Sequence, residues 1–436
     1  MTSAVDQFIS DNSIETVELA AVDAMGAIRG KRIPASAFRP GKQFAISSGL
    51  YCLDYGLGVM SVGSYSWANG YPDVFLVPDL ATLRLVPWRP ATALVFCDVV
   101  GRAGQPVPLD PRQILSRAQE QAWQAGFDPR FGLETEFYLL DPDSLRPRHS
   151  RNPIYSLHDD SYLWPVIRDI QSALLAVGVE VEASEAEYGP GQVEINLGHS
   201  PSLAAADNLL FFRYAVKQIA AAHGYLATFM AKPWAESSGS GLHVHQSLRC
   251  RETGRNAFWD GETGGLSAHG RWYLGGLVQH AAETCYVAVP TPNGYKRSTS
   301  YSFAPTHVTW GFDHRSAALR ALVHGDGGTR LEHRVASADA NPYFLVATQL
   351  LAGLAGLEKQ LEPPSAATTD VYAATDAEPL PRSVPEAVAR LNESTFARSA
   401  LGEEMTQLLC LLGQTEQAAA DAEVTDWERR RYLESV

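Results

Sequence analysis

The sequence predicts a protein of mixed strands and helices in two domains. At 436 residues the chain is too long for one ordinary hydrophobic core. Residues 1–105 alternate short apolar runs with turn residues, which is typical of a small β-rich domain. Beyond that point strand-like and helix-like segments are mixed, so we assign residues 106–436 to a second, larger domain.

The first domain is expected to consist mainly of short strands. Apolar runs bounded by turn residues predict strands at residues 17–22, 73–79 and 93–98. The glycine-containing segment 26–30 predicts a turn from which the chain returns. The domain ends near residues 108–111, where Asp110 is suited to cap a helix and Pro111 to occupy its first position.

In the second domain, apolar periodicity separates helices from strands. Helices are predicted at residues 112–125, 161–177, 203–223, 341–361 and 426–436. Strands are predicted at residues 131–140, 179–185, 192–197 and 242–248. Glycines directly follow three of the helical patterns, as is common at helix ends. Residues 363–385, rich in Pro, Ala, Thr and Asp, predict a loop.

Bulk properties exclude several classes of partner. The net charge of −14 argues against nucleic acid as the main partner. The five cysteines are scattered without CxxC spacing, which indicates reduced thiols and a cytoplasmic protein. No apolar run of about 18 residues predicts a membrane span, and no basic-then-apolar segment at the N-terminus predicts export.

Two glutamates on one predicted strand suggest a metal site. Glu134 and Glu136 are two residues apart, so their side chains point to the same face of a strand. Such like charges repel unless a cation lies between them. The alternative is a solvated strand face, but the apolar neighbours Leu133 and Phe137 predict a buried strand, where unpaired carboxylates are costly.

Further candidate ligands occur in three other segments: Glu187 and Glu194, His243 and His245, and Glu332. The alternatives are exposed acids on a surface hairpin and histidines satisfied in the core. Carboxylates with a single imidazole suit Mg²⁺ or Mn²⁺ better than structural zinc. Divided over two ions, the set can bridge nucleotide phosphates during phosphoryl transfer.

Five arginines cluster in about forty residues and predict anion binding: Arg297, Arg315, Arg320, Arg330 and Arg334. The guanidinium group binds carboxylate and phosphate oxygens through two parallel hydrogen bonds. Any one of these arginines is equally explained by a surface salt bridge, which contributes little. Their proximity to the candidate ligand Glu332 favours anion binding.

The motifs together resemble the glutamine synthetase superfamily along nearly the whole chain. The matching segments are Gly132-Leu-Glu134-Thr-Glu136-Phe137, Glu187-x-x-Pro-Gly-Gln-x-Glu194, Lys232-Pro233, Gly239-Ser-Gly-Leu-His243-Val-His245-Gln-Ser247, Asn293-x-Tyr295-Lys-Arg297, Arg315-Ser316, Arg330-x-Glu332-x-Arg334 and Asn341-Pro342-Tyr343. The order and spacing of these segments are highly specific.

The resemblance implies a role for each matching residue. One metal ion would be held by Glu136, Glu187 and Glu194, and a second by Glu134, His243 and Glu332. Glutamate would be bound by Gly239, Arg297 and Arg334. The ATP site would be lined by Glu182, His245 and Ser247, with Arg320 and Arg330 facing the phosphates of ATP. Arg315 would contact the transferred phosphoryl group, and we place it with Glu332 among the catalytic residues.

The implied reaction has two steps. ATP phosphorylates the γ-carboxylate of L-glutamate, and an amine then displaces phosphate from the acyl phosphate. Three departures bear on the amine. Phe303 stands where glutamine synthetases carry a glutamate that helps handle ammonium, and Ser238 replaces an asparagine beside the glutamate substrate. The ammonium-binding aspartate is missing from its usual stretch, although Asp54 lies slightly earlier and either replaces it or is a turn residue.

These departures resemble the glutamate–amine ligase branch, which acts on putrescine, other polyamines, ethanolamine or monoamines. The alternatives are a glutamine synthetase with an altered ammonium site and a non-catalytic member of the fold. The resemblance implies an α+β fold, with an N-terminal β-grasp-like domain and a glutamine-synthetase-type catalytic domain built on an antiparallel sheet. It also implies active sites between neighbouring subunits, in a homo-oligomer of two stacked hexameric rings, a dodecamer.

Overall fold

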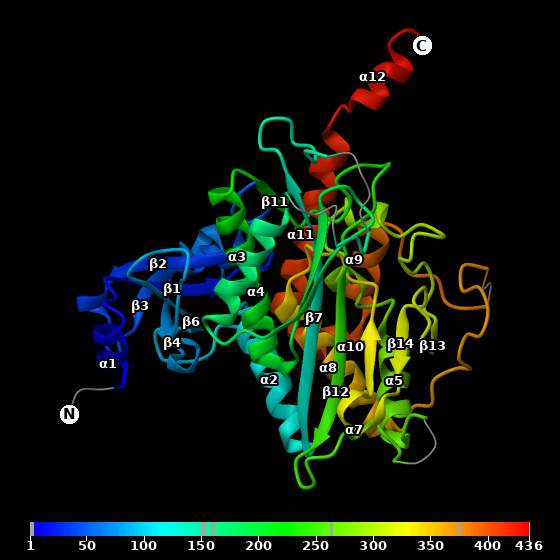
Figure 1. Cartoon of the computed structure of the whole chain (residues 1–436), viewed down its shortest axis with the longest axis horizontal. Coiled ribbons are helices and arrows are strands. Elements are labelled where there is room, and N and C mark those ends of the chain that lie inside the picture. The colour runs from blue at the N-terminus through cyan, green and yellow to red at the C-terminus, as the bar shows by residue number, and fades with distance from the viewer. Residues whose placement is uncertain (1–3, 150–153, 158–161, 262–264, 374–375, 436) are drawn as a thin grey trace.

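The computed structural model describes residues 4–149, 154–157, 162–261, 265–373 and 376–435. Two β-sheets organise it. The first lies at one side of the molecule and the second runs through its centre, with helices between and behind them (Figure 1). The predicted fold class, α+β, is confirmed by this arrangement. The division at residue 105 stays a prediction.

The first sheet has strand order β2-β1-β6-β4-β3, with β5 paired to β6. Its elements are α1 Ala4–Asp11, β1 Thr16–Val22, β2 Ile28–Pro34, β3 Phe44–Ser47, β4 Asp73–Pro78, β5 Arg84–Leu85 and β6 Thr92–Val100. The central pair β1 and β6 is parallel and the other neighbours are antiparallel. The three strands predicted in this region are confirmed.

The second sheet has nine strands and carries the acidic motifs. Its order is β13-β14-β15-β12-β7-β9-β8, and β10 and β11 both pair with β7. The strands are β7 Phe127–Leu140, β8 Val181–Ala186, β9 Gln192–Leu197, β10 Ser200–Pro201, β11 Leu226–Thr228, β12 Leu242–Cys250, β13 Trp310–Phe312, β14 Leu319–Leu322 and β15 Arg330–His333. All neighbours are antiparallel except β13 and β14. Strand β7 begins earlier than predicted because residues 127–130 pair with the end of β12.

Helices cover the back of the second sheet and fill the space beside the first. They are α2 Pro111–Gln124, α3 Trp164–Leu175, α4 Ser202–Ala222, α5 Ala268–His280, α6 Cys285–Ala288, α7 Gly325–Gly328, α8 Pro342–Lys359, α9 Val384–Glu393, α10 Thr395–Leu401, α11 Glu403–Ala422 and α12 Asp426–Tyr432. Asp110 caps α2 as predicted, accepting a hydrogen bond from the Arg112 backbone. Asn341 caps α8 in the same way through Tyr343.

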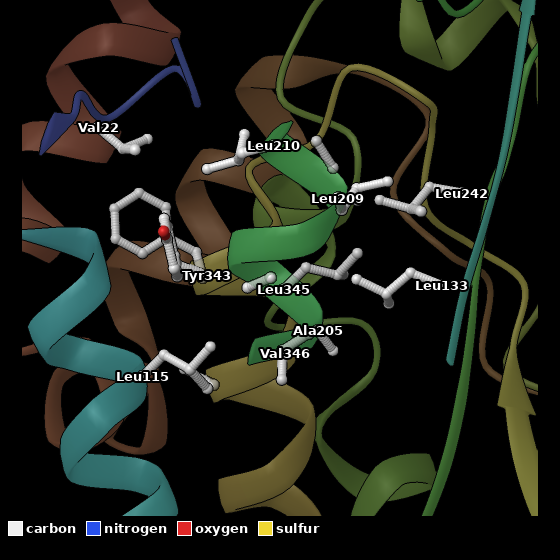
Figure 2. Close-up of a cluster of buried hydrophobic side chains, with 14 of the residues drawn as sticks. Val22, Leu115, Leu133, Ala205, Leu209, Leu210, Leu242, Tyr343, Leu345 and Val346 are labelled. Atoms are coloured by element: carbon white, nitrogen blue, oxygen red, sulfur yellow. The ribbon is translucent and has the colours of Figure 1, made fainter. Parts of the chain in front are cut away.

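The core joins the two sheets through α2, α4 and α8. Leu133 of β7 and Leu242 of β12 face Leu209 of α4, and Val346 of α8 packs beside Ala205 (Figure 2). All five side chains are buried. These contacts bury the apolar back of the second sheet, so its opposite face is free for polar side chains.

A buried arginine connects the helices to the first sheet. Arg112 of α2 is 2% exposed and bonds to Asp207 of α4, Asp98 of β6 and Asp79. Helices α2 and α4 are therefore held against the first sheet by one charge network as well as by apolar packing. In contrast, α12 projects from the body of the molecule (Figure 1) and contains no buried residue. Among the described residues, no helix combines the length and apolar character needed to cross a membrane.

Candidate active site

The polar face of the second sheet carries a row of facing carboxylates and imidazoles. Glu134 and Glu136 project from β7, which lies between β12 and β9. Antiparallel register sets His243 opposite Glu134 and Glu194 opposite Glu136. Because directly opposed residues point to the same side of a sheet, strand pairing alone brings these four groups together.

The first group consists of Glu136, Glu187 and Glu194. One carboxylate oxygen from each lies within 4.8 Å of the others. None of the ion pairs between described residues involves these three carboxylates. Burial, and then the charge of Glu136, raise the pKa of Glu187 to about 7 and that of Glu194 well above its usual range. The raised pKa values show that the described protein compensates the negative charge of this group only in part, which favours binding of a cation.

The second group consists of Glu134, His243, His245 and Glu332. His243 Nδ1 lies 3.7 Å from Glu134 Oε2 and 3.8 Å from Glu332 Oε1. His245 Nε2 lies 3.0 Å from Glu134 Oε1. Ligand atoms of Glu134, His245 and Glu332 also fall within 4.8 Å of one another. Both histidines therefore face the same pair of carboxylates, although the resemblance implies only His243 as a ligand.

The second group differs from the first in its charge balance. Glu332 is 1% exposed and pairs with Arg334 and, at 3.0 Å, with Arg320. Burial alone raises the pKa of Glu332, but His245, Arg334 and His243 lower it to about 2. Burial, and then Arg334, lower the pKa of His243, which leaves its imidazole neutral and able to bind a metal.

The donor sets fit divalent cations of the magnesium and manganese type. Carboxylate oxygens dominate both groups, with imidazole nitrogens confined to the second. Glu134 and Glu194 also form a third close set with His243, so the two groups adjoin rather than stand apart. We infer that Glu136, Glu187 and Glu194 would hold one ion and that Glu134, His243 and Glu332 would hold the other.

A cavity of about 490 Å³ opens beside the first group. It is lined by Arg315, predicted for phosphoryl transfer, and by all five residues predicted to bind the substrates: Ser238, Gly239, Arg297, Phe303 and Arg334. A Cβ atom at Gly239 would lie 2.7 Å from Arg297 Cγ, and one at Gly241 would lie 2.6 Å from Arg297 Nη2. The glycines of this loop are therefore required for the close approach of a buried guanidinium.

A second cavity, of about 350 Å³, opens on the other side of Glu134, which lines both cavities. It contains four residues predicted to bind ATP: Glu182, His245, Ser247 and Arg330. Arg330 Nε donates to His245 Nδ1 at 3.0 Å, which turns Nε2 of that ring toward Glu134. The two cavities meet at the metal groups, an arrangement suited to transfer between a nucleotide and a second substrate.

Two predicted residues lie apart from these cavities. Arg320 is sequestered between Glu332 and Asp313 and lines neither cavity. Asp54 lies in the first sheet's connecting loop, where it accepts a hydrogen bond from the Gly58 backbone at 2.7 Å. Within one chain Asp54 behaves as a turn residue, and its catalytic role stays a prediction.

Aromatic side chains form the outer wall of the first cavity. Phe303 stacks on Tyr188 with ring centroids 6.1 Å apart, and both rings are exposed at the mouth. Tyr301 and Tyr155 line the same wall, and the Tyr301 hydroxyl donates to Asp370 at 3.1 Å. Phe303 does not fill a core position, so its apolar ring is available to a ligand.

Sequence reasoning assigned no role to several residues that line the cavities: Tyr155, Glu185, Tyr188, Lys232 and Tyr301 in the first, and Arg130, His199, Asn256, Gly327 and Gly328 in the second. Glu185 had a detectable signal, since it ends the strand predicted at residues 179–185 and precedes Glu187 by two residues. The short turn carrying Gly327 and Gly328 had none, because its approach to the second cavity depends on tertiary folding.

Comparison with known proteins places this geometry in a family. Residues 108–432 match the sequence profile described as glutamine synthetase, catalytic domain. The glutamate–isopropylamine ligase of a Pseudomonas species is 36% identical over 451 residues, covering 99% of this chain and 98% of that protein. The gamma-glutamylethanolamide synthetase GlnA4 of Streptomyces coelicolor is 35% identical over 442 residues, covering 98% and 94%. A solved structure described as a GmaS/ADP complex superposes with a TM-score of 0.89 at 30% identity, covering 99% and 100%.

Proposed function

Because this chain belongs to the glutamine synthetase family, on its glutamate–amine ligase branch, we propose that it joins the γ-carboxylate of L-glutamate to an organic primary amine. ATP-dependent γ-glutamyl ligation is the reaction of this branch. One relative is named for isopropylamine, which is a short primary amine. The other is named for a gamma-glutamylethanolamide, which is the amide of another short amine. The amine of this enzyme belongs to the same chemical class, which also includes putrescine.

In the first step a γ-carboxylate oxygen attacks the terminal phosphorus of ATP, and ADP leaves. Arg297 and Arg334 bind the glutamate carboxylates in the first cavity, and Gly239 contributes its backbone. Arg315 faces the transferred phosphoryl group from the rim of that cavity, and Arg330 faces the nucleotide in the second. Divalent cations, when bound, neutralise the phosphate charge that develops in this transfer.

In the second step the amine nitrogen attacks the acyl carbon of γ-glutamyl phosphate. The nitrogen attacks as the free base, and the C–O bond to phosphate breaks so that phosphate leaves with the bonding electrons. The nitrogen then loses a proton to the departing phosphate or to solvent, which gives the amide. The chain's residues hold the acyl phosphate between the two cavities and exclude water from it. A bound amine at the aromatic mouth then reaches the reactive carbon from the open side.

The observation that carries the choice of acceptor is the position of Phe303. Its ring is exposed at the cavity mouth against Tyr188, where an acidic side chain would attract ammonium. A phenyl ring supplies no counter-charge, but it packs on the carbon chain of an alkylamine and offers a cation–π face. These properties favour an organic amine over ammonium.

The test is phosphate release with ATP, glutamate and Mg²⁺ or Mn²⁺ against a panel of amines. The panel contains ammonium, ethylamine, isopropylamine, ethanolamine, putrescine and spermidine. We expect release with at least one organic amine and little with ammonium. Release with ammonium alone would identify a glutamine synthetase with an altered ammonium site, and no release with any amine would favour another acid substrate or a non-catalytic member.

We further propose that the enzyme acts in the cytoplasm as a dodecamer of two hexameric rings. The five free cysteines support a reducing compartment. The location of Asp54 supports an oligomer, since this residue is remote from its own chain's cavities and would need a neighbouring subunit to reach one. Analytical ultracentrifugation tests the assembly, and loss of activity in Asp54→Ala without a change in mass would support the shared site.

A further inference from the structure

Two carboxylates that line the first cavity, Glu185 and Glu236, belong to neither metal group. Glu185 of β8 is the register partner of Glu194, which is itself the partner of Glu136. Three carboxylates thus form a row across β7, β9 and β8, on the same face of the sheet. Glu185 is the outermost of the three and is absent from every close ligand set found among the described residues.

Glu185 also lacks a partner within the described chain. No hydrogen bond or ion pair joins its side chain to another described residue. Glu236, which lies at the rim of the same cavity, is instead paired with Arg146 at 3.0 Å. The charge of Arg315 in the same cavity acts on Glu185, but no ion pair between described residues joins the two, so this partly buried carboxylate is only partly compensated. The charge of Glu185 is therefore available to a cation that enters the cavity.

The surroundings of Glu185 suit an organic cation. Tyr155, Tyr188 and Phe303 line the same cavity, and the backbone of Tyr155 donates to Ala186, the residue next to Glu185, at 3.0 Å. One carboxylate beside several aromatic faces is the combination that recognises an alkylammonium group, through charge on one side and ring contact on the other. A metal ion would gain nothing from the rings.

We propose that Glu185 binds the ammonium group of the incoming amine and so determines that the acceptor is a cationic primary amine. This inference rests on the function proposed above. At neutral pH an alkylamine arrives almost entirely protonated, and the other carboxylates facing the cavity are committed to metal ions or to arginine. Glu185 gives the ammonium group a counter-charge beside the acyl phosphate. The bound group then loses one proton to solvent, which frees the nitrogen lone pair for attack.

Glu185→Gln tests the proposal because it removes the charge while keeping the shape. With ethylamine, or whichever alkylamine the enzyme uses fastest, we expect KM for the amine to rise at least tenfold. KM for glutamate and for ATP should stay within twofold. Hydroxylamine is the decisive second acceptor, since it is uncharged at neutral pH and should be used equally by the variant and the parent enzyme.

Glu180→Gln is the matched control, because it removes an exposed carboxylate beside the same strand and outside both cavities. It should leave KM for every substrate unchanged. Thermal unfolding measures how much Mn²⁺ stabilises the fold. The increase in Tm on adding Mn²⁺ should be the same in Glu185→Gln and the parent enzyme.

Two results would overturn the proposal. A smaller Mn²⁺ stabilisation would make Glu185 a metal ligand, and an equal loss with alkylamine and hydroxylamine would make it a positioning residue for the acyl phosphate. The parent enzyme is the control for the proposed function. If it uses no organic amine, the proposed function itself fails, whatever the Glu185 variant does.

Discussion

The two ends of the first cavity are built in opposite ways. At the metal end, Glu136 accepts hydrogen bonds from Gln192 at 2.9 Å and from the Gly241 backbone at 3.1 Å, all within buried structure. At the outer end, Tyr301 is 75% exposed and Phe303 is 48% exposed. Both of these aromatic residues adopt positive φ, +63° and +59°, which bulky side chains rarely do.

The fixed metal end suits the activation of glutamate, and the exposed outer end suits the selection of the amine acceptor. Phosphorylation of glutamate needs donors and charges held in fixed positions before the reaction, so that no reorganisation is required at the transition state. The acceptors named for the two relatives differ, and the acceptor wall proposed here is carried by a loop whose aromatic side chains are exposed. A positive φ at a bulky residue costs about 1–3 kcal/mol, and such strain is found where a loop is shaped for a ligand.

The largest effect should come from the metal end. Glu187→Gln should lower kcat/KM by about 1,000-fold, roughly 4 kcal/mol of lost transition-state stabilisation, because a neutral amide cannot complete the first metal group. Stability without metal should be unchanged or higher, since the substitution removes repulsion from Glu136. Steady-state kinetics measures kcat/KM, and thermal unfolding in EDTA measures stability without metal. Near-normal activity of the variant would show that Glu187 is not a metal ligand.

Glu332→Ala is the informative contrast to that variant. Activity should again be lost, but stability should fall by about 3–5 kcal/mol, because Arg334 stays buried without its ion-pair partner and Arg320 keeps the exposed Asp313 in place of a buried carboxylate. Urea unfolding without metal measures the difference. Equal stability in the two variants would show that the charge balance of the two metal groups does not differ.

The next effect concerns the glycine loop at the same end. Gly241→Ala should raise KM for glutamate about 100-fold, because the new Cβ would lie 2.6 Å from Arg297 Nη2 and 3.2 Å from His243 Nε2. A displacement of about 1 Å at a substrate-binding group is enough for a loss of that size. KM for the amine should change little, which kinetics at saturating ATP can establish. If the amine is affected as strongly as glutamate, the two ends of the cavity are not independent.

A moderate effect should appear in the pH dependence of metal binding. The pKa of Glu187 is raised to about 7 in the folded protein, so below that pH the group is protonated and a metal must displace its proton. Mn²⁺ affinity should therefore be about tenfold weaker at pH 6 than at pH 7.5. Without metal the sign reverses, since the folded state binds the extra proton and its stability should rise as pH falls from about 7 toward 4.5.

Calorimetric titration at the two pH values measures the affinity, and Glu187→Gln should flatten its pH dependence. A parent affinity that does not change with pH would show that Glu187 is already ionised without metal.

Much of the metal end was predictable because its residues follow strand periodicity. Glu134 and Glu136 share a face by their spacing, and each segment that carries a ligand is an apolar strand or a glycine turn. The contacts between strands were not predictable, because they depend on register. His245 meets Glu332 across β12 and β15, and Arg320 meets Glu332 across β14 and β15. Arg320 thus lies in an ion-pair network, and its role at a phosphate stays a prediction.

The outer end was harder to predict for the same physical reason. Glu185 reaches the cavity only because β8 pairs with β9 after an irregularity between Val181 and Ala183. Tyr155 and Tyr188 belong to loops, whose conformations follow no period in the sequence. The helices that follow the predicted loop, α9 to α11, were also not predicted, although α11 alone spans 20 residues.

The smallest predicted effect tests the outer wall itself. Phe303→Ala should raise KM for an alkylamine about five- to tenfold, which corresponds to the ~1 kcal/mol that an aromatic contact contributes. KM for glutamate should not change, because Arg297 and the glycine loop do not contact the ring. The matched control is Phe312→Ala, which removes an exposed phenyl ring from β13 outside both cavities. A gain in ammonium use without any loss of alkylamine affinity would mean that Phe303 acts by excluding the smaller acceptor rather than by binding the larger one.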